Sequence, residues 1–316
     1  MNPAPSSRRT LLLAAILALL LPGCGAQGMG VSQNSSANSE RPEHRATAGL
    51  ETGKQIYQVH CAGCHGARGD GRGPAARFLD PKPADFTRGI FKFASVKAGQ
   101  LPRDEDLLRT LTRGLPGSSM PSWQALPDEN QRAVIAYLKT FSPAWSRNPP
   151  GIPIAVSEDP YRSGGPEAAR QAVARGREVY HVVATCWQCH AAYASPEEVD
   201  LMAKARDAGP VKLRAQAEQP ATIIDARGRR IATPDFRKSP MKNGSSLVDL
   251  YKTIGAGIGG TAMPSWKDAL EEKDLWALTY YVKSLADERW RRPRSVPGTP
   301  AESEANPAAR YRATLR

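Results

Sequence analysis

The sequence predicts an all-α fold made of two tandem domains, and three observations lead to this prediction. The motif Cys-x-x-Cys-His occurs twice, at 61–65 and 186–190. A diverged repeat surrounds the two copies, and its best-matching segments, 106–123 and 249–266, lie a constant 143 residues apart. Apolar residues recur at the three- and four-residue steps of amphipathic helices, and no segment shows the convincing alternation of a strand.

The N-terminus has the layout of an export signal. Residues 1–23 carry Arg8 and Arg9, an apolar stretch over 11–21, and then Pro-Gly before Cys24. This stretch is too short to span a membrane, which disfavours an uncleaved anchor. The end of the segment resembles a bacterial lipobox, so we expect cleavage before Cys24 and lipidation of that residue. An ordinary signal peptide is the alternative. The sequence therefore predicts a periplasmic protein that a lipid anchors to the membrane.

The first domain is expected over 49–142. It follows residues 24–48, whose Gly, Ser and Asn content predicts a flexible leash from the lipid. A helix is expected at about 49–61, before the first Cys-x-x-Cys-His motif. A second helix is expected to begin after Pro127, because acidic residues open it and apolar residues then follow at helical spacing.

A connector with six prolines, 143–166, leads to the second domain. It is expected to be extended and fairly stiff, between two domains that fold separately. The second domain is expected over 167–287, with one helix at about 167–185 and a closing helix from 271 to 285.

Two further segments of the second half have no repeat partner. The run Ser195-Pro196-Glu197-Glu198 has the pattern of a capped helix start, and it opens an insertion. Residues 288–316 hold several arginines without apolar periodicity, so they predict a basic, disordered tail. Such a tail could also dock onto acidic partners or anionic lipid.

The duplicated motif has a specific chemistry. Two thiols three positions apart can each form a thioether with one vinyl group of the same haem, and the next histidine then lies under the iron. Zinc sites and disulfides also use paired cysteines, but no second pair lies at zinc-ribbon spacing. We therefore expect two covalently attached haem c groups. The residues that would hold them are Cys61, Cys64, His65, Cys186, Cys189 and His190.

The second ligand of each iron is expected to be Met120 in the first domain and Met263 in the second. Both methionines lie in a repeated Met-Pro-Ser-Trp, after a glycine-rich approach that can shape a rigid loop. Met241 is the rival in the second domain. The histidines just before the motifs, His60 and His181, are too close to the motifs to reach the opposite face. We expect them at the surface or beside the haem propionates.

Tyr57 to Gly66, together with Met120-Pro121, resembles the class I bacterial cytochrome c domain. The second half resembles the same domain, and the resemblance covers about 49–142 and 168–286. It implies that the histidine of each motif and the later methionine bind the iron from opposite sides. The second half departs from the family pattern, because Ala191 stands where the first half has Gly66 and the Gly-Asp-Gly loop is missing.

The expected function is electron transfer. Iron bound by histidine and methionine has no open position and a raised reduction potential, which suits electron exchange. We expect a dihaem cytochrome that passes single electrons between respiratory redox proteins, as a mobile carrier or as a subunit of a larger complex. The formal net charge of +12 indicates partners that are acidic at the docking face, and no motif indicates nucleic-acid binding.

The alternative class is a dihaem enzyme. A peroxidase needs one iron with an open or displaceable position, and two matched methionines argue against it. Some thiosulfate-oxidising enzymes use a cysteine ligand, and outside the two motifs the only cysteine is Cys24.

Overall fold

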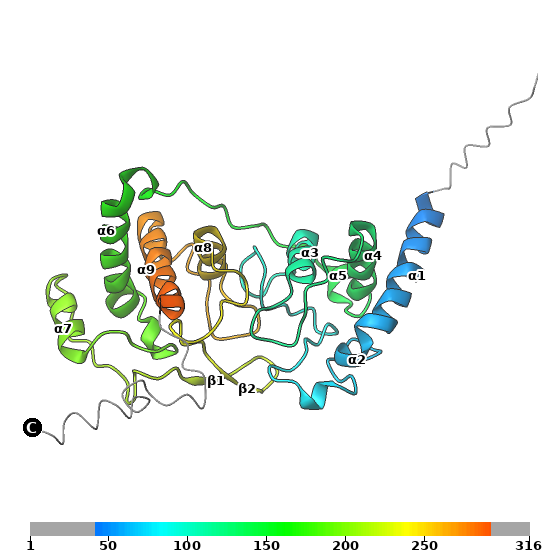
Figure 1. Cartoon of the computed structure of the whole chain (residues 1–316), viewed down its shortest axis with the longest axis horizontal. Helices are drawn as coiled ribbons and strands as arrows, with labels where there is room; N and C mark the ends of the chain where they lie inside the picture. Colours follow the sequence, from blue (N-terminus) through cyan, green and yellow to red (C-terminus); the bar gives the residue numbers. More distant parts are fainter. Residues whose placement is uncertain (1–41, 292–316) are drawn as a thin grey trace, which may run out of the picture. The chain divides into compact units, whose positions relative to one another are not determined.

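The computed structural model describes residues 42–291, and helices dominate them (Figure 1). None of the helices in this range is both long enough and apolar enough to cross a membrane. The helices of the first half, 42–142, and of the connector are α1 (Pro42–His60), α2 (Ala62–His65), η1 (Ala76–Phe78), α3 (Asp104–Arg113), α4 (Asp128–Lys139), α5 (Ala144–Arg147) and η2 (Arg162–Gly164). The elements of the second half, 165–291, are α6 (Gly165–Glu178), η3 (Val179–Val183), η4 (Cys186–Gln188), α7 (Pro196–Lys204), β1 (Thr222–Ile224), β2 (Arg230–Ala232), α8 (Leu247–Ala256) and α9 (Glu272–Arg291).

The two halves repeat one helix crossing. In the first half α1 packs on α4, and in the second half α6 packs on α9 (Figure 1). A Cβ atom on Gly53 would lie 2.0 Å from the carbonyl oxygen of Ala133, and one on Gly176 would lie 2.0 Å from that of Ala277. Gly53 and Gly176 occupy equivalent places before the two motifs. Packing explains why both are glycine, because only a residue without a Cβ lets the two helices approach this closely.

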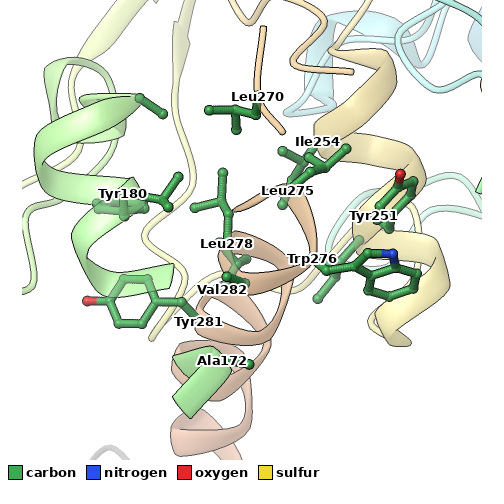
Figure 2. Packing of buried hydrophobic residues seen from close by; sticks show 14 of the residues in the cluster. Ala172, Tyr180, Tyr251, Ile254, Leu270, Leu275, Trp276, Leu278, Tyr281 and Val282 are labelled. Carbon is green, nitrogen blue, oxygen red and sulfur yellow. The ribbon is translucent and has the colours of Figure 1, made fainter. Parts of the chain in front are cut away.

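The larger hydrophobic core belongs to the second half. Figure 2 shows α9 presenting Leu278, Tyr281 and Val282 to the side chains around it. The rings of Tyr251 on α8 and Trp276 on α9 are 4.5 Å apart between centroids. The first half has a smaller core between α3 and α4, whose buried members are Leu107, Leu111, Val134 and Ile135.

The predicted closing helices and the helices before the motifs are all present, but the outer two extend further than predicted. Helix α1 already begins at Pro42, so the last part of the predicted leash 24–48 is helical. Helix α9 continues to Arg291, so the start of the predicted tail 288–316 is helical as well. The remaining parts of both segments, and with them Cys24, lie outside the described residues.

The insertion of the second half contains a capped helix and a small hairpin. The hydroxyl of Ser195 accepts a hydrogen bond from the Glu198 amide at 3.2 Å, and the Glu198 carboxylate accepts one from the Ser195 amide at 2.8 Å. The predicted helix start is confirmed. The strands β1 and β2 pair antiparallel in register Ile223 to Ile231. Three residues per strand are too few for a readable alternation, so the sequence did not predict them. The fold remains all-α.

The connector is packed against both halves. The amide of Ile154 donates to the carbonyl of Ser95 at 2.8 Å, and Pro153 forms an antiparallel bridge with Val96. On the other side, the indole N–H of Trp276 on α9 donates to the hydroxyl of Ser157 at 3.0 Å. The connector therefore contacts both halves through hydrogen bonds, in addition to joining them covalently.

The halves also meet directly, in a way that repeats itself. A Cβ atom on Gly260 would lie 2.7 Å from Ile90 Cγ2, and one on Gly117 would lie 2.2 Å from Pro240 Cγ. Gly117 and Gly260 are equivalent in the repeat. Ile90 and Pro240 are equivalent as well, because each lies four residues after the phenylalanine of an Asp-Phe pair, at 85–86 and at 235–236. Each half thus places an equivalent residue against the loop of the other half that leads to Met120 or Met263 (the methionine loop). This is an approximate two-fold relation that the sequence did not predict.

Candidate haem sites

The histidine of each motif is held by a backbone carbonyl. Nδ1 of His65 donates to the carbonyl of Ala84 at 3.0 Å, and Nδ1 of His190 donates to that of Pro234 at 3.1 Å. A proton on Nδ1 leaves the lone pair of Nε2 free, which is the arrangement that proteins use to orient a metal-binding imidazole.

The same backbone segments supply an aromatic ring for each histidine. The ring of His65 stacks on Phe86 and the ring of His190 stacks on Phe236, each with centroids 4.6 Å apart. Burial lowers the pKa of both histidines, which favours the neutral imidazole that binds metal. The two phenylalanines occupy equivalent places in the repeat, in Asp85-Phe86 and Asp235-Phe236, and this contact explains the shared aromatic ring.

A buried tyrosine fixes the chain just after each motif. The hydroxyl of Tyr57 donates to the carbonyl of Gly66 at 2.8 Å, and that of Tyr180 donates to the carbonyl of Ala191 at 2.7 Å. Burial raises the pKa of both tyrosines, so both stay neutral donors. The change from glycine to alanine in the second half thus leaves this contact intact.

The two methionine loops have the same hydrogen bonds. The carbonyl of Met120 accepts from the Leu115 amide at 3.0 Å, and its amide donates to the Ser118 hydroxyl at 3.2 Å. In the second loop the carbonyl of Met263 accepts from the Ile258 amide at 3.2 Å, and its amide donates to the Thr261 hydroxyl at 3.2 Å.

A glycine opens each of these loops. Gly114 and Gly257 have φ of +65° and +77°. A Cβ atom on either would lie 2.6 Å from the carbonyl carbon of the proline that follows the methionine. Both positions therefore need glycine, for conformation and for space.

Each methionine packs in the same apolar cluster as the first cysteine of its motif. Met120 and Cys61 border the core of the first half, and Met263 and Cys186 border that of the second. Met241 also borders the second core. It occupies the repeat position of Phe91, which packs in the first core, so its place is explained by packing alone.

The histidines that precede the motifs differ from each other. His60 is exposed and lies 5.3 Å from Trp123 between ring centroids. His181 is fully buried, so the surface, one of the two positions predicted for it, is wrong. Its Nδ1 donates to the Arg177 carbonyl at 2.8 Å, and its Nε2 accepts from the Tyr193 amide at 3.2 Å. A buried imidazole with both nitrogens bonded was not readable from spacing.

The four motif cysteines are free thiols in the structure, so they form no disulfides. Within residues 42–291 no group of three or more His, Cys, Asp or Glu side chains could hold a metal ion by itself, as a zinc site would. The donors instead come as two thiols and one oriented imidazole in each half. This set fits covalent haem, which brings its own four nitrogens to the iron.

Comparisons with known proteins agree with these two sites. Residues 50–142 match the family of cytochrome c, and residues 171–282 match the family described as cytochrome C oxidase, cbb3-type, subunit III. No curated protein matched the sequence significantly. Among solved structures, a chain of the reducing HAO-like protein complex of Kuenenia stuttgartiensis is similar, with 32% sequence identity and a TM-score of 0.62. The likeness covers 74% of this chain and 96% of that chain.

Two consecutive domains of this kind, each with its own Cys-x-x-Cys-His motif, define a protein class with two haem groups. The chain belongs to the dihaem c-type cytochromes, and its two domains imply covalently bound haem c in each half.

Proposed function

We propose that this dihaem cytochrome transfers single electrons between redox proteins and that it is not itself an enzyme. The observation that carries the proposal is the equivalence of the two methionine loops, which present Met120 and Met263 with the same hydrogen bonds. His65 and Met120 would hold the first haem iron, and His190 and Met263 would hold the second. Iron held by both donors would have no free position for a substrate and would exchange electrons with little rearrangement.

The protein groups around each haem c have separate tasks. Each motif supplies two thioether links and an imidazole, and the haem supplies the redox chemistry. The carbonyls of Ala84 and Pro234 keep the imidazoles in the tautomer that binds iron. The buried rings of Phe86 and Phe236 hold their orientation and exclude water beside them.

We further propose that the chain works as a subunit of a larger redox complex. The similar chain from Kuenenia stuttgartiensis is part of a complex of HAO-like proteins, and 96% of that chain is covered by the likeness. The formal net charge of +12 favours partners with an acidic docking face. The export signal and Cys24 support a periplasmic address with a lipid anchor.

Carbon monoxide binding separates this function from the enzyme class. We expect the reduced, unmodified protein to bind no carbon monoxide and to turn over no hydrogen peroxide. Binding at either haem would show an open position, and the peroxidase alternative would then replace electron transfer.

Subunit status and docking need two other measurements. After mild detergent extraction we expect a redox partner to co-purify with the chain. Reduction by that partner should slow as ionic strength rises, because salt screens the attraction between a basic cytochrome and an acidic face. A reduction rate that does not change with ionic strength would show that the net charge plays no role in docking.

A further inference from the structure

The first half supports its Cys-x-x-Cys-His motif with neutral backbone groups. The carbonyl of Ala62 accepts from the Gly66 amide at 2.9 Å, and the carbonyl of His65 accepts from the Gly71 amide at 2.8 Å. Both donors belong to the glycine-rich loop that follows the motif. The second half lacks this loop, so the equivalent carbonyls of Trp187 and His190 need other donors.

One arginine side chain from the insertion supplies them. Nε of Arg214 donates to the carbonyl of Trp187 at 3.0 Å, and its Nη2 donates to the carbonyl of His190 at 3.1 Å. The planar guanidinium can reach both carbonyls at once, because its donors form a rigid fork. Arg214 therefore replaces two backbone amides of the missing loop.

The replacement brings a positive charge to which no carboxylate is bonded within residues 42–291. The remaining donors of Arg214 also go to backbone carbonyls, those of Ala215, Gln216 and Gln219. Among residues 42–291 no carboxylate forms a hydrogen bond or an ion pair with this guanidinium, which is only partly exposed to solvent. In the first half a neutral amide, that of Gly71, donates to the carbonyl of the motif histidine His65. In the second half the cationic guanidinium of Arg214 donates to the equivalent carbonyl of His190.

We propose that Arg214 is a positioning residue that also raises the reduction potential of the second haem. The proposal rests on the electron-transfer function proposed above. Reduction lowers the positive charge of the iron, so a nearby fixed cation stabilises the ferrous form relative to the ferric form. Hydrogen bonding and charge around the axial ligand are among the means by which a protein sets a haem potential.

The test is a redox titration of the purified dihaem protein in which the two haems are resolved. Arg214→Gln removes the positive charge. Arg214→Lys keeps the positive charge but lacks the planar arrangement of donors that reaches both carbonyls. The matched control is Arg230→Gln, which removes the same charge from an exposed arginine of β2. Gln219→Glu is a further variant, because it places a carboxylate beside Arg214 while leaving the backbone carbonyl of residue 219 as an acceptor.

We expect Arg214→Gln to lower the ferrous-to-ferric ratio of the second haem several-fold at a fixed potential, where tenfold corresponds to 59 mV. In Arg214→Lys the second haem should retain most of its wild-type reduction potential, and in Gln219→Glu the reduction potential of the second haem should fall. The first haem should be unchanged in every variant, and Arg230→Gln should change neither haem.

Equal shifts in the Gln and Lys variants, or no shift in either, would overturn the proposal. If Arg214→Gln fails to retain its second haem, Gln219→Glu still decides, and an unchanged potential there refutes the role of the charge. These outcomes concern the potentials of haems that keep both ligands. They are therefore distinct from a failure of the proposed function, which an open iron position would reveal.

Discussion

Pro240 of the second half lies directly against Gly117 in the methionine loop of the first half. A Cβ atom on Gly117 would be only 2.2 Å from Pro240 Cγ, and Gly260 has the corresponding relation to Ile90. Ion pairs reinforce this interface, since Asp249 lies 3.6 Å from Arg109 and 3.5 Å from Arg113. The loops that present the two methionines are therefore also the loops through which the halves meet.

This interface predicts that the halves stay together when the connector is cut. A protease site can replace 148–150, which are exposed. We expect both fragments of the cleaved protein to elute together in size-exclusion chromatography, at the position of the uncut control. Two separate haem-bearing peaks at physiological salt would show that the connector 143–166 alone joins the two halves.

The repeated glycine of the helix crossing gives a second prediction. Gly53→Ala and Gly176→Ala should each destabilise their own half by about 1–3 kcal/mol or more, because the added Cβ meets a backbone carbonyl that cannot move aside. Gly49→Ala on α1 is the control, since nothing lies within 4 Å of a Cβ there. It should be neutral or stabilise the helix by up to about 1 kcal/mol. Hydrogen exchange read by mass spectrometry can follow each half separately. Equal protection in all three variants would show that the helices do not pack this closely at Gly53 and Gly176.

Buried His181 predicts a pH dependence of stability. Burial lowers its pKa from 6.5 to about 4, so the folded protein keeps the ring neutral where the unfolded chain already takes up a proton. The contribution of neutral His181 to the free energy of unfolding is fully present above about pH 6.5, and it declines as the pH falls toward 4. Between pH 7 and pH 5 the loss should be about 2 kcal/mol.

The comparison that checks this is urea unfolding at both pH values. His181→Gln should lose less stability between pH 7 and pH 5 than the wild type does. His60→Gln changes an exposed histidine and should follow the wild type. Identical pH slopes for all three proteins would mean that His181 is not buried in its neutral form.

The parts of this structure that the sequence predicted are those in which local pattern decides. The repeat and the helical spacing located α4 and α9, and the capping pattern located the start of α7 at Ser195. The Cys-x-x-Cys-His spacing located the haem motifs because the covalent chemistry permits little variation.

The parts that the sequence missed depend on contacts between distant segments. Arg214 lies 24 residues after the carbonyl of His190, and nothing in its neighbourhood marks it as a substitute for a glycine loop. Ile90 and Pro240 differ in type, so their shared place at the interface is visible only in three dimensions. The position of His181 cannot be derived from its distance to the motif, because it depends on a hydrogen bond from the Tyr193 amide, twelve residues further along the chain.

The spectrum of the ferric protein can show whether histidine and methionine bind both irons, as we propose. We expect two low-spin haems with the weak long-wavelength charge-transfer band of a thioether ligand. Met120→Ala should abolish the contribution of the first haem alone, and Met263→Ala that of the second, with Met241→Leu as a control that changes neither. Each opened haem should bind carbon monoxide when reduced, and its potential should fall. A high-spin iron in the unmodified protein, or a Met263→Ala variant with an unchanged spectrum, would show that at least one iron is not bound by histidine and methionine.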